Sequence, residues 1–449
     1  MHKRIRWVVL AGLAVAGASI AWVGISPADD TKYATITNSQ AREMLDKVEA
    51  DIKANYFDPK MHGMDLDKRF GEARQKISAA KSQDEALLSI AAAVAALDDS
   101  HTRFTPPVRP YGVEYGWDTL TIGDSACYVT AVRADSDAAA KGLKPGDQIV
   151  SINGIRVQRD DLRNIEYSYF VFPQSGFHLD VRSPDGVDRT FVAMAKVIPG
   201  QVMITHADVM TWARTHRYTG DDDRSRYHEA NKQVLFWKLP DFLVDPANVD
   251  GLLSTTRNYG TVVFDLRGNP GGLIGAEEKF LGGVFDHDVK IGDRKSREGL
   301  KPVIAKTRGK KAFDGKLIVL IDSKSASASE LFARVVQLEK RGTVLGDRSA
   351  GAVREGKMFV HAVALDRINV TQYSAMISVA DLIMTDGKTL EHVGVMPDER
   401  VLPTSADIAA GRDPVLARAA ELAGVKLTPE EAGKIFPFQW PKEEIPRMD

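Results

Sequence analysis

The sequence has one cysteine in 449 residues, Cys127, which excludes an internal disulfide framework. Its charges nearly cancel, with 59 basic residues against 61 acidic ones, so the charge balance indicates neither nucleic acid nor an anionic surface as a partner. None of the ten histidines stands in an H-x-x-x-H or E-x-x-H pattern, and we therefore predict no metal site and no cofactor. Cys127 alternates with Val129 and Ala131 as in a strand, which favours a buried structural thiol over a nucleophile.

A long charge-free run occurs only at the beginning of the chain. His2, Lys3, Arg4 and Arg6 precede the apolar run 7–25, and small residues follow at 26–28. Residues 1–28 therefore match a signal peptide, although the run is also long enough for an uncleaved membrane anchor. Either interpretation predicts an exported body, in a bacterial periplasm or at the periplasmic face of the inner membrane. We expect membrane contact only through this segment, if it is retained.

Residues 31–106 have the pattern of a helical segment. Ser39 can cap a helix with apolar residues on one face, and Ser82 and Glu85 have the spacing of a capping box for another. The second helix is predicted to end near Ser100 and His101, before Pro106 and Pro107. A histidine after a helix is most often a dipole partner or a surface residue.

Residues 107–197 change to alternating, strand-like patterns. One segment contains, in order, a short alanine-rich helix, the turn Gly142-Leu143-Lys144-Pro145-Gly146-Asp147 and the hairpin Ile152-Asn153-Gly154. This segment resembles a PDZ domain. Such domains bind a peptide as an additional strand at a sheet edge. The expected peptide-binding loop is Gly112, Val113, Glu114, Tyr115 and Gly116, which departs from the usual Gly-Leu-Gly-Phe.

After a polar stretch at 198–232, predicted to be a linker loop, an α/β pattern occupies residues 233–405. The apolar strand 261–266 enters the turn Arg267-Gly268-Asn269-Pro270-Gly271-Gly272. This turn could be a tight strand-to-helix connection, a phosphate loop, or a turn whose amides face a reaction centre. The absence of Gly-Lys-Ser/Thr disfavours the phosphate loop. Residues 406–449 are predicted to form a last helix and a tail.

A serine-rich turn joins a predicted buried strand to a predicted helix. The strand is 316–321, and Ser325-Ala326-Ser327-Ala328-Ser329-Glu330 follows it directly. A strand, tight turn and helix in this order present a side chain at the carboxyl end of a sheet, near the amides of the first helical turn. The same residues fit S-x-x-E, a capping box that only begins a helix, so both interpretations stay open at this point.

Five elements in order resemble the C-terminal processing (tail-specific) serine peptidases, from about residue 40 to about residue 420. They are residues 97–104, the PDZ segment, 265–272, 325–330 and 391–398. The resemblance implies a multidomain chain with a helical N-terminal segment, a β-rich PDZ domain and an α/β ClpP/crotonase-like catalytic core that hydrolyses peptide bonds. By position in the motif, Ser327 is the expected nucleophile, ahead of Ser325 and Ser329. The expected oxyanion donors are the backbone amides of Gly271 or Gly272 and of Ala328.

The chain departs from the commoner family pattern at the base. Members with a Ser–Lys dyad carry a lysine where this sequence has Ala352. Arg354 cannot replace it because a guanidinium stays protonated, and Lys357 is several residues out of register.

Ser100-His101 instead resembles the serine–histidine pair of the tricorn protease branch. We therefore expect His101 as general base, oriented by Ser100 and Glu391. A surface carboxylate is the alternative for Glu391.

Two functions compete at this stage. The first is a serine endopeptidase acting on exported polypeptides that are unfolded or expose their C-termini, with an adaptor protein as a further conceivable partner. The second is a catalytically silent PDZ-type peptide-binding protein on the same fold, which the missing lysine and the atypical PDZ loop support. The presence of a serine, a histidine and a glycine turn in their expected elements favours the enzyme.

Overall fold

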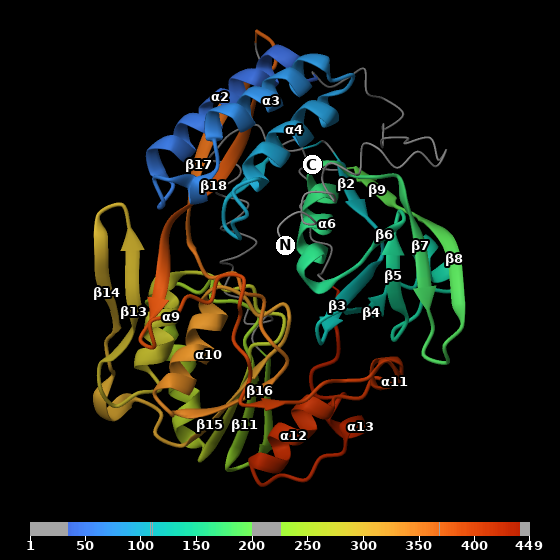
Figure 1. Cartoon of the computed structure of the whole chain (residues 1–449). Coiled ribbons are helices and arrows are strands. Elements are labelled where there is room, and N and C mark those ends of the chain that lie inside the picture. Colours follow the sequence, from blue (N-terminus) through green and yellow to red (C-terminus); the bar gives the residue numbers. More distant parts are fainter. Residues whose placement is uncertain (1–34, 108, 110, 200–225, 368, 441–449) are drawn as a thin grey trace. The chain divides into compact units, whose positions relative to one another are not determined.

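The computed structural model describes residues 35–107, 109, 111–199, 226–367 and 369–440 (Figure 1). The predicted signal peptide or anchor, residues 1–28, lies outside the described residues. The described chain divides into two compact units: the first takes residues from 1–212, 356–379 and 439–449, the second from 213–355 and 380–438. No helix in the described ranges is both long and apolar enough to cross a membrane.

The first unit begins with a helical layer, as the sequence predicts. Thr37 caps the first helix in place of the predicted Ser39, because its side chain accepts the Gln40 amide, and Ser82 caps the third by accepting the Glu85 amide. The apolar face of the first helix, with Met44, Leu45 and Ile52, is fully buried. The elements are α2 (Asn38–Asn55), η2 (Met61–Gly63), α3 (Leu66–Ala79), α4 (Gln83–Ala95) and the short strand β1 (Arg103–Thr105).

Two later strands complete the core of this helical layer. They are β17 (Glu355–Ala364) and the first part of β18 (Val370–Met384), which pairs with β1 through residues 374–376. Val363, Tyr373 and Ile377 are buried in the same hydrophobic cluster as Met44 and Phe70. Residues 356–379, which the sequence pattern assigned to the α/β core at 233–405, therefore belong to the first unit.

The PDZ domain is an antiparallel sheet in the order β3-β4-β5-β7-β8, with β6 paired to β5. Cys127 is fully buried in its core, as predicted. Leu162 and Ile165 of the helix α6 are buried in the same hydrophobic cluster as the sheet residues Val129 and Leu179. A separate two-stranded sheet joins β2 to β9. The elements are β2 (Tyr111–Glu114), β3 (Trp117–Ile122), β4 (Ala126–Val132), α5 (Asp137–Ala140), β5 (Gln148–Ile152), β6 (Ile155–Arg156), α6 (Arg159–Val171), β7 (Gly176–Arg182), β8 (Asp188–Met194) and β9 (Lys196–Pro199).

The second unit contains a sheet in the order β10-β11-β12-β15-β16-β19, parallel except for β10. Residues 226–231, predicted as part of a linker loop, form β10 and pair with β11. The elements are β10 (Arg226–Asn231), β11 (Val234–Lys238), α8 (Val249–Ser254), η3 (Thr255–Asn258), β12 (Thr261–Asp265), α9 (Ile274–Gly282), β15 (Lys316–Ile321), α10 (Ala328–Leu338), β16 (Gly342–Gly346) and β19 (Glu399–Arg400).

Both faces of this sheet are buried, which explains why its strands are almost continuously apolar. Alternate residues such as Phe264 and Val319 pack against Phe280 and Phe332 of α9 and α10. The intervening residues, such as Ile318, pack against the C-terminal helix α12. The remaining elements of the unit are β13 (Val289–Ser296), β14 (Gly299–Ala305), η4 (Gly309–Lys311), α11 (Ser405–Ala409), α12 (Pro414–Leu422) and α13 (Pro429–Ala432). The multidomain fold class predicted from the sequence is confirmed.

Candidate active site

Two turns of the second unit emerge at the same edge of its sheet. The strands β12 and β15 are parallel neighbours, with Asp265 paired to Leu320 near their carboxyl ends. The glycine turn 266–272 follows β12, and the serine turn 322–327 follows β15. In open parallel sheets this edge is where ligands and substrates bind. The two motifs singled out in the sequence are thus brought together by the topology.

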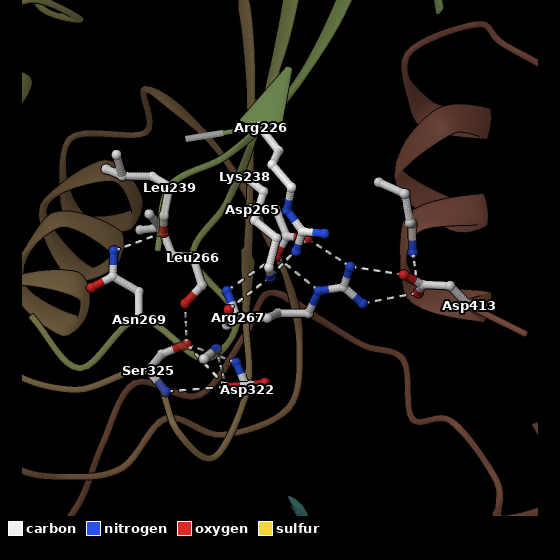
Figure 2. A network of polar contacts seen from close by, with 12 residues as sticks. Arg226, Lys238, Leu239, Asp265, Leu266, Arg267, Asn269, Asp322, Ser325 and Asp413 are labelled. Carbon is white, nitrogen blue, oxygen red and sulfur yellow. Dashed lines mark hydrogen bonds and ion pairs between the residues drawn. The ribbon is translucent and has the colours of Figure 1, made fainter. Parts of the chain in front are cut away.

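The three serines of the segment 325–330 lie in different environments. Ser325 is fully buried, and its hydroxyl donates to the Leu266 carbonyl oxygen at 2.8 Å (Figure 2). Ser329 is also fully buried and donates to the Asn269 carbonyl oxygen at 3.0 Å. Both hydroxyls therefore tie the serine turn to the glycine turn. Ser327 is partly exposed, which makes it the accessible serine of the three.

Ser327 adopts a backbone conformation that non-glycine residues rarely take. Its φ is 55° and its ψ is −121°, at the residue preceding α10. Such a conformation costs roughly 1–3 kcal/mol and persists only where the surroundings hold it. The Ser327 amide donates to the Ala352 carbonyl oxygen at 2.8 Å and to Glu330 Oε2 at 3.1 Å. Ser327 is the N-cap of α10, so the capping interpretation is correct and is compatible with a nucleophile at the same position.

The two glycines of the first turn have different partners. A methyl group on Gly271 would come within 2.6 Å of Ser327 Cβ, whereas one on Gly272 would come within 2.3 Å of the Phe242 carbonyl carbon. The Gly271 amide donates to Asn269 Oδ1 at 2.9 Å. Among the described residues, the amides of Gly272 and Ala328 donate to no acceptor. These two donors are therefore available in the second unit beside the serine turn.

A charged network anchors the strand that leads into the glycine turn (Figure 2). Arg267 donates to the fully buried carboxylate of Asp265 at 2.7 Å and to Asp413, at the beginning of α12, at 2.8 Å. Lys238 Nζ lies 3.5 Å from Asp265 Oδ2. Burial alone would raise the pKa of Asp265, but the charges of Arg267 and Lys238 hold this pKa well below its ordinary value. This network could not be predicted from the sequence, because Asp413 is 148 residues from Asp265.

The turn after β16 contacts Ser327 through a backbone carbonyl oxygen, and it contains no lysine at the position expected for a base. Ala352, at the position of the lysine in Ser–Lys relatives, uses its carbonyl oxygen to accept the Ser327 amide. Lys357 lies on β17 in the first unit, with its ammonium over the Phe359 ring at 5.4 Å. The second unit therefore has no lysine base at either of these two positions.

Glu391 is buried in the second unit, with its side chain 1% exposed. Its Oε2 atom accepts the Val353 amide at 3.0 Å. The alternative of a surface carboxylate is therefore wrong. The neighbouring His392 amide donates to the Gly351 carbonyl oxygen at 2.9 Å, which fixes this loop against the turn after β16.

His101 lies in the first unit, in a turn organised by Asp99. Asp99 Oδ1 accepts the amides of His101 at 2.9 Å and Thr102 at 3.0 Å, and Oδ2 accepts the Tyr56 hydroxyl at 2.8 Å. The Ser100 hydroxyl lies 2.8 Å from His101 Nδ1. In the tautomer in which Nδ1 donates to Ser100, Nε2 carries the lone pair that can accept a proton. The role of Asp99 in this turn was not predicted from the sequence.

In the PDZ domain, the predicted peptide-binding loop is partly a strand. Gly112, Val113 and Glu114 belong to β2 and pair with residues 196–198 of β9. The Tyr115 ring packs on Phe177 with centroids 4.2 Å apart. Gly116 has a φ of 81° and precedes β3, which is an edge strand of the described sheet. The role of this loop in peptide binding stays a prediction.

Comparisons with known proteins agree with this architecture. Residues 234–401 match the model of peptidase family S41, and residues 128–166 match the model of the PDZ domain. The chain is therefore a serine-type peptidase that carries a PDZ domain. The predicted resemblance to the C-terminal processing peptidases is confirmed.

The relatives carry matching names at low identity. The carboxyl-terminal-processing protease of Synechocystis sp. is 23% identical over 340 residues, covering 72% of each chain. The carboxy-terminal-processing protease of Bartonella bacilliformis is 25% identical over 304 residues, covering 63% of this chain and 61% of that protein. The crystal structure of mature CPAF has a TM-score of 0.60 at 15% identity, covering 83% of this chain and 94% of that one, and supports the fold.

Proposed function

We propose that this protein is a serine endopeptidase in which Ser327 is the nucleophile and His101 the general base. The observation that carries the proposal is the conformation of Ser327: a partly exposed serine with a φ of 55°, at the beginning of a helix and beside a glycine turn. A serine in such a strained strand-to-helix turn presents its hydroxyl beside the amides that stabilise an oxyanion. Ser100 and Glu391 are proposed to orient the imidazole.

The chemistry follows from these roles. Neutral His101 accepts the Ser327 proton while Oγ attacks the carbonyl carbon of the scissile peptide bond. The tetrahedral intermediate collapses when the imidazolium donates that proton to the leaving amine, and a water molecule then hydrolyses the acyl ester by the same steps. Nucleophile and base belong to different units, so the proposed reaction requires both units.

The oxyanion donors are proposed to be the amides of Gly272 and Ala328. Both Gly271 and Gly272 are candidates by sequence, but the Gly271 amide already donates to Asn269 Oδ1. The Gly272 and Ala328 amides donate to no acceptor in the described part of the chain. Two amides directed at one oxygen are the usual arrangement for stabilising a tetrahedral intermediate, and each donor is worth about 2.7–4 kcal/mol of the barrier.

The proposed substrates are exported polypeptides that are unfolded or expose a C-terminal segment. The basic and then apolar N-terminal sequence supports an exported location, in a periplasm or anchored at the inner membrane. In the PDZ domain, β3 pairs with β4 alone among the described strands, so its other edge can accept a peptide as an added strand. Residues 112–116 and an adaptor protein remain proposed parts of this recognition.

Labelling with a fluorophosphonate tests the proposal directly. Wild-type protein and the variants Ser327→Ala, His101→Ala and His287→Ala are labelled, and the modified peptide is identified by mass spectrometry. His287 is the matched control because its side chain is 61% exposed and lies in the second unit.

We expect labelling at Ser327 in the wild type and in His287→Ala, and a loss of at least 100-fold in His101→Ala. Wild-type protein that is folded and binds peptide but is not labelled at Ser327 would support the alternative, a silent PDZ-type binding protein.

A further inference from the structure

We propose that Glu330 is a positioning residue that holds both the nucleophile turn and the loop of Glu391 in their reactive geometry. The inference rests on the proposed function, since it concerns the same site. Glu330 is the third residue of α10 and is fully buried. Its role differs from that of a helix cap because its carboxylate reaches beyond its own helix.

The Glu330 carboxylate accepts four hydrogen bonds. Oε1 accepts the Ser349 hydroxyl at 2.6 Å and the Gly351 amide at 2.7 Å. Oε2 accepts the Ala352 amide at 2.8 Å and the Ser327 amide at 3.1 Å. A carboxylate has about four lone-pair sites, so its accepting capacity is filled. One bond goes to the nucleophile turn and three go to the turn after β16.

All four partners donate to Glu330 here, an arrangement that the ionised carboxylate satisfies in full. A glutamine side chain at this position would direct an N–H group at one of the three backbone amide donors in either orientation of its amide. Burial raises the pKa of Glu330, and the bonds from Ser349, Ala352, Gly351 and Ser327 act in the opposite direction. The buried charge is also placed in the first turn of α10, where the helix dipole favours an anion.

The turn after β16 is hydrogen-bonded in turn to the loop that contains Glu391. The Ser349 amide donates to the Val395 carbonyl oxygen at 3.1 Å, and the Ser349 hydroxyl accepts the Val395 amide. The His392 amide donates to the Gly351 carbonyl oxygen, and the Val353 amide donates to Glu391 Oε2 at 3.0 Å. A continuous series of contacts therefore leads from Ser327 through Glu330 and residues 349–353 to Glu391.

The turn 349–353 and the loop 389–396 pack closely against each other through their backbones. A methyl group on Gly351 would come within 3.0 Å of the Val393 amide nitrogen, and one on Gly394 within 2.7 Å of the Ser349 carbonyl oxygen. Both contacts are to backbone atoms, which cannot rotate away. Loss of the Glu330 contacts therefore displaces both loops rather than one. A displacement of about 1 Å at a nucleophile can reduce the rate about 100-fold.

The test uses the full chain with Glu330→Gln, Ser349→Ala and the control Thr256→Val. Thr256 is fully buried in the second unit and donates its hydroxyl to the Leu253 carbonyl oxygen, so its removal destabilises that unit away from the site. Peptide hydrolysis is measured as kcat and KM, and amide hydrogen exchange is measured over residues 325–330, 349–353 and 389–396.

We expect Glu330→Gln to lower kcat about 100-fold and Ser349→Ala about 10-fold, each with KM changed less than threefold. Exchange should increase at both 349–353 and 389–396 in these two variants and not in Thr256→Val. If Glu330→Gln fails to fold, the kinetic constants and the hydrogen exchange are both measured on Ser349→Ala alone.

The inference is overturned if Ser349→Ala keeps wild-type kcat, or if its increased exchange is absent from 389–396. An inactive wild type whose variants show the expected exchange pattern would instead reject the proposed function and leave the coupling of the loops standing.

Discussion

The Cα atom of Gly271 faces the Cβ atom of Ser327 so closely that a methyl group on the glycine would come within 2.6 Å of it. The same methyl group would lie 2.9 Å from the Ala328 amide nitrogen. The glycine turn after β12 and the nucleophile turn after β15 are therefore in direct backbone contact. The requirement for glycine at this position is steric as well as conformational.

Gly271→Ala should abolish labelling of Ser327 and slow peptide hydrolysis at least 100-fold, because the new methyl group must displace the nucleophile. Gly268→Ala is the matched control: Gly268 also has a positive φ, of 75°, but nothing lies within 4 Å of its added methyl. Both variants place an alanine at a positive φ, which costs roughly 1 kcal/mol. Only in Gly271→Ala does the new methyl group also clash with Ser327. Equal activities in the two variants would argue against a steric role for Gly271.

Ser325→Ala and Ser329→Ala should destabilise the protein without removing its reactive serine. Each substitution removes the hydroxyl donor of a buried carbonyl oxygen, of Leu266 or Asn269, that keeps one backbone amide donor, at a cost of about 0.5–1.5 kcal/mol. The free energy of unfolding in urea and fluorophosphonate labelling at Ser327 are the two measurements. Loss of the label with an unchanged free energy of unfolding, in either variant, would instead assign the nucleophile to that serine.

Arg267→Met should lower the free energy of unfolding by about 3–5 kcal/mol at pH 7, because it leaves the buried Asp265 carboxylate without its main partner. In the wild type the pKa of Asp265 is held below its ordinary value, so its contribution to stability is present at neutral pH. That contribution is lost as the pH falls below the ordinary aspartate range.

In the Arg267→Met variant, protonation of Asp265 relieves the buried charge. The stability deficit should therefore shrink between pH 7 and pH 4, measured by urea unfolding at each pH. Arg418→Met is the control, since Arg418 makes a partly exposed ion pair with Glu399 and its loss should change stability little at any pH. A deficit independent of pH would contradict this account of the Asp265 network.

Glu277→Gln should stabilise the protein at alkaline pH by roughly 1–3 kcal/mol. Glu277 is fully buried on α9, and within the described residues neither carboxylate oxygen has a hydrogen-bond partner. Burial, and secondarily the charge of Glu278, raise the pKa of Glu277 well above its ordinary value. Folding therefore becomes less favourable as the pH rises from the ordinary glutamate pKa through the raised one.

Thermal melts of Glu277→Gln and wild type at pH 5 and pH 8 measure this effect. The gain should be larger at pH 8, because the amide does not ionise. The half-buried Glu278, whose pKa burial also raises, provides the control Glu278→Gln with a smaller expected gain. An equal increase in melting temperature at both pH values would show that the effect does not come from the ionisation of Glu277.

The sequence predicts those features of the fold that depend on short-range patterns. The apolar runs before Gly268 and Ser325 predict two buried strands, and both are present as parallel neighbours. The order of turns and strands around Gly146 predicts the PDZ domain, which the match to residues 128–166 confirms. The accessibility of Ser327 relative to Ser325 and Ser329 could not be predicted, since it depends on hydrogen bonds to a turn more than fifty residues away.

Features that depend on distant partners could not be predicted from one sequence. Glu330 is assigned by its spacing to a capping box, and nothing in that spacing indicates that Ser349, Gly351 and Ala352 also bind it. The burial of Glu391 likewise depends on the Val353 amide, 38 residues earlier in the chain. The membership of residues 356–379 in the first unit was missed because their alternating pattern fits a strand in either unit.

The order in which the chain is synthesised has a consequence for how the first unit matures. Its hydrophobic core includes Val363, Tyr373, Ala375 and Ile377, which follow the serine turn in the sequence. A polypeptide that is still emerging cannot bury the apolar faces of α2, α3 and α4 fully until these residues arrive. Completion of the layer that carries His101 therefore waits until Ser327 has already been made. Any chain truncated before residue 363 leaves that layer with exposed apolar surface, open to chaperones and to other proteases.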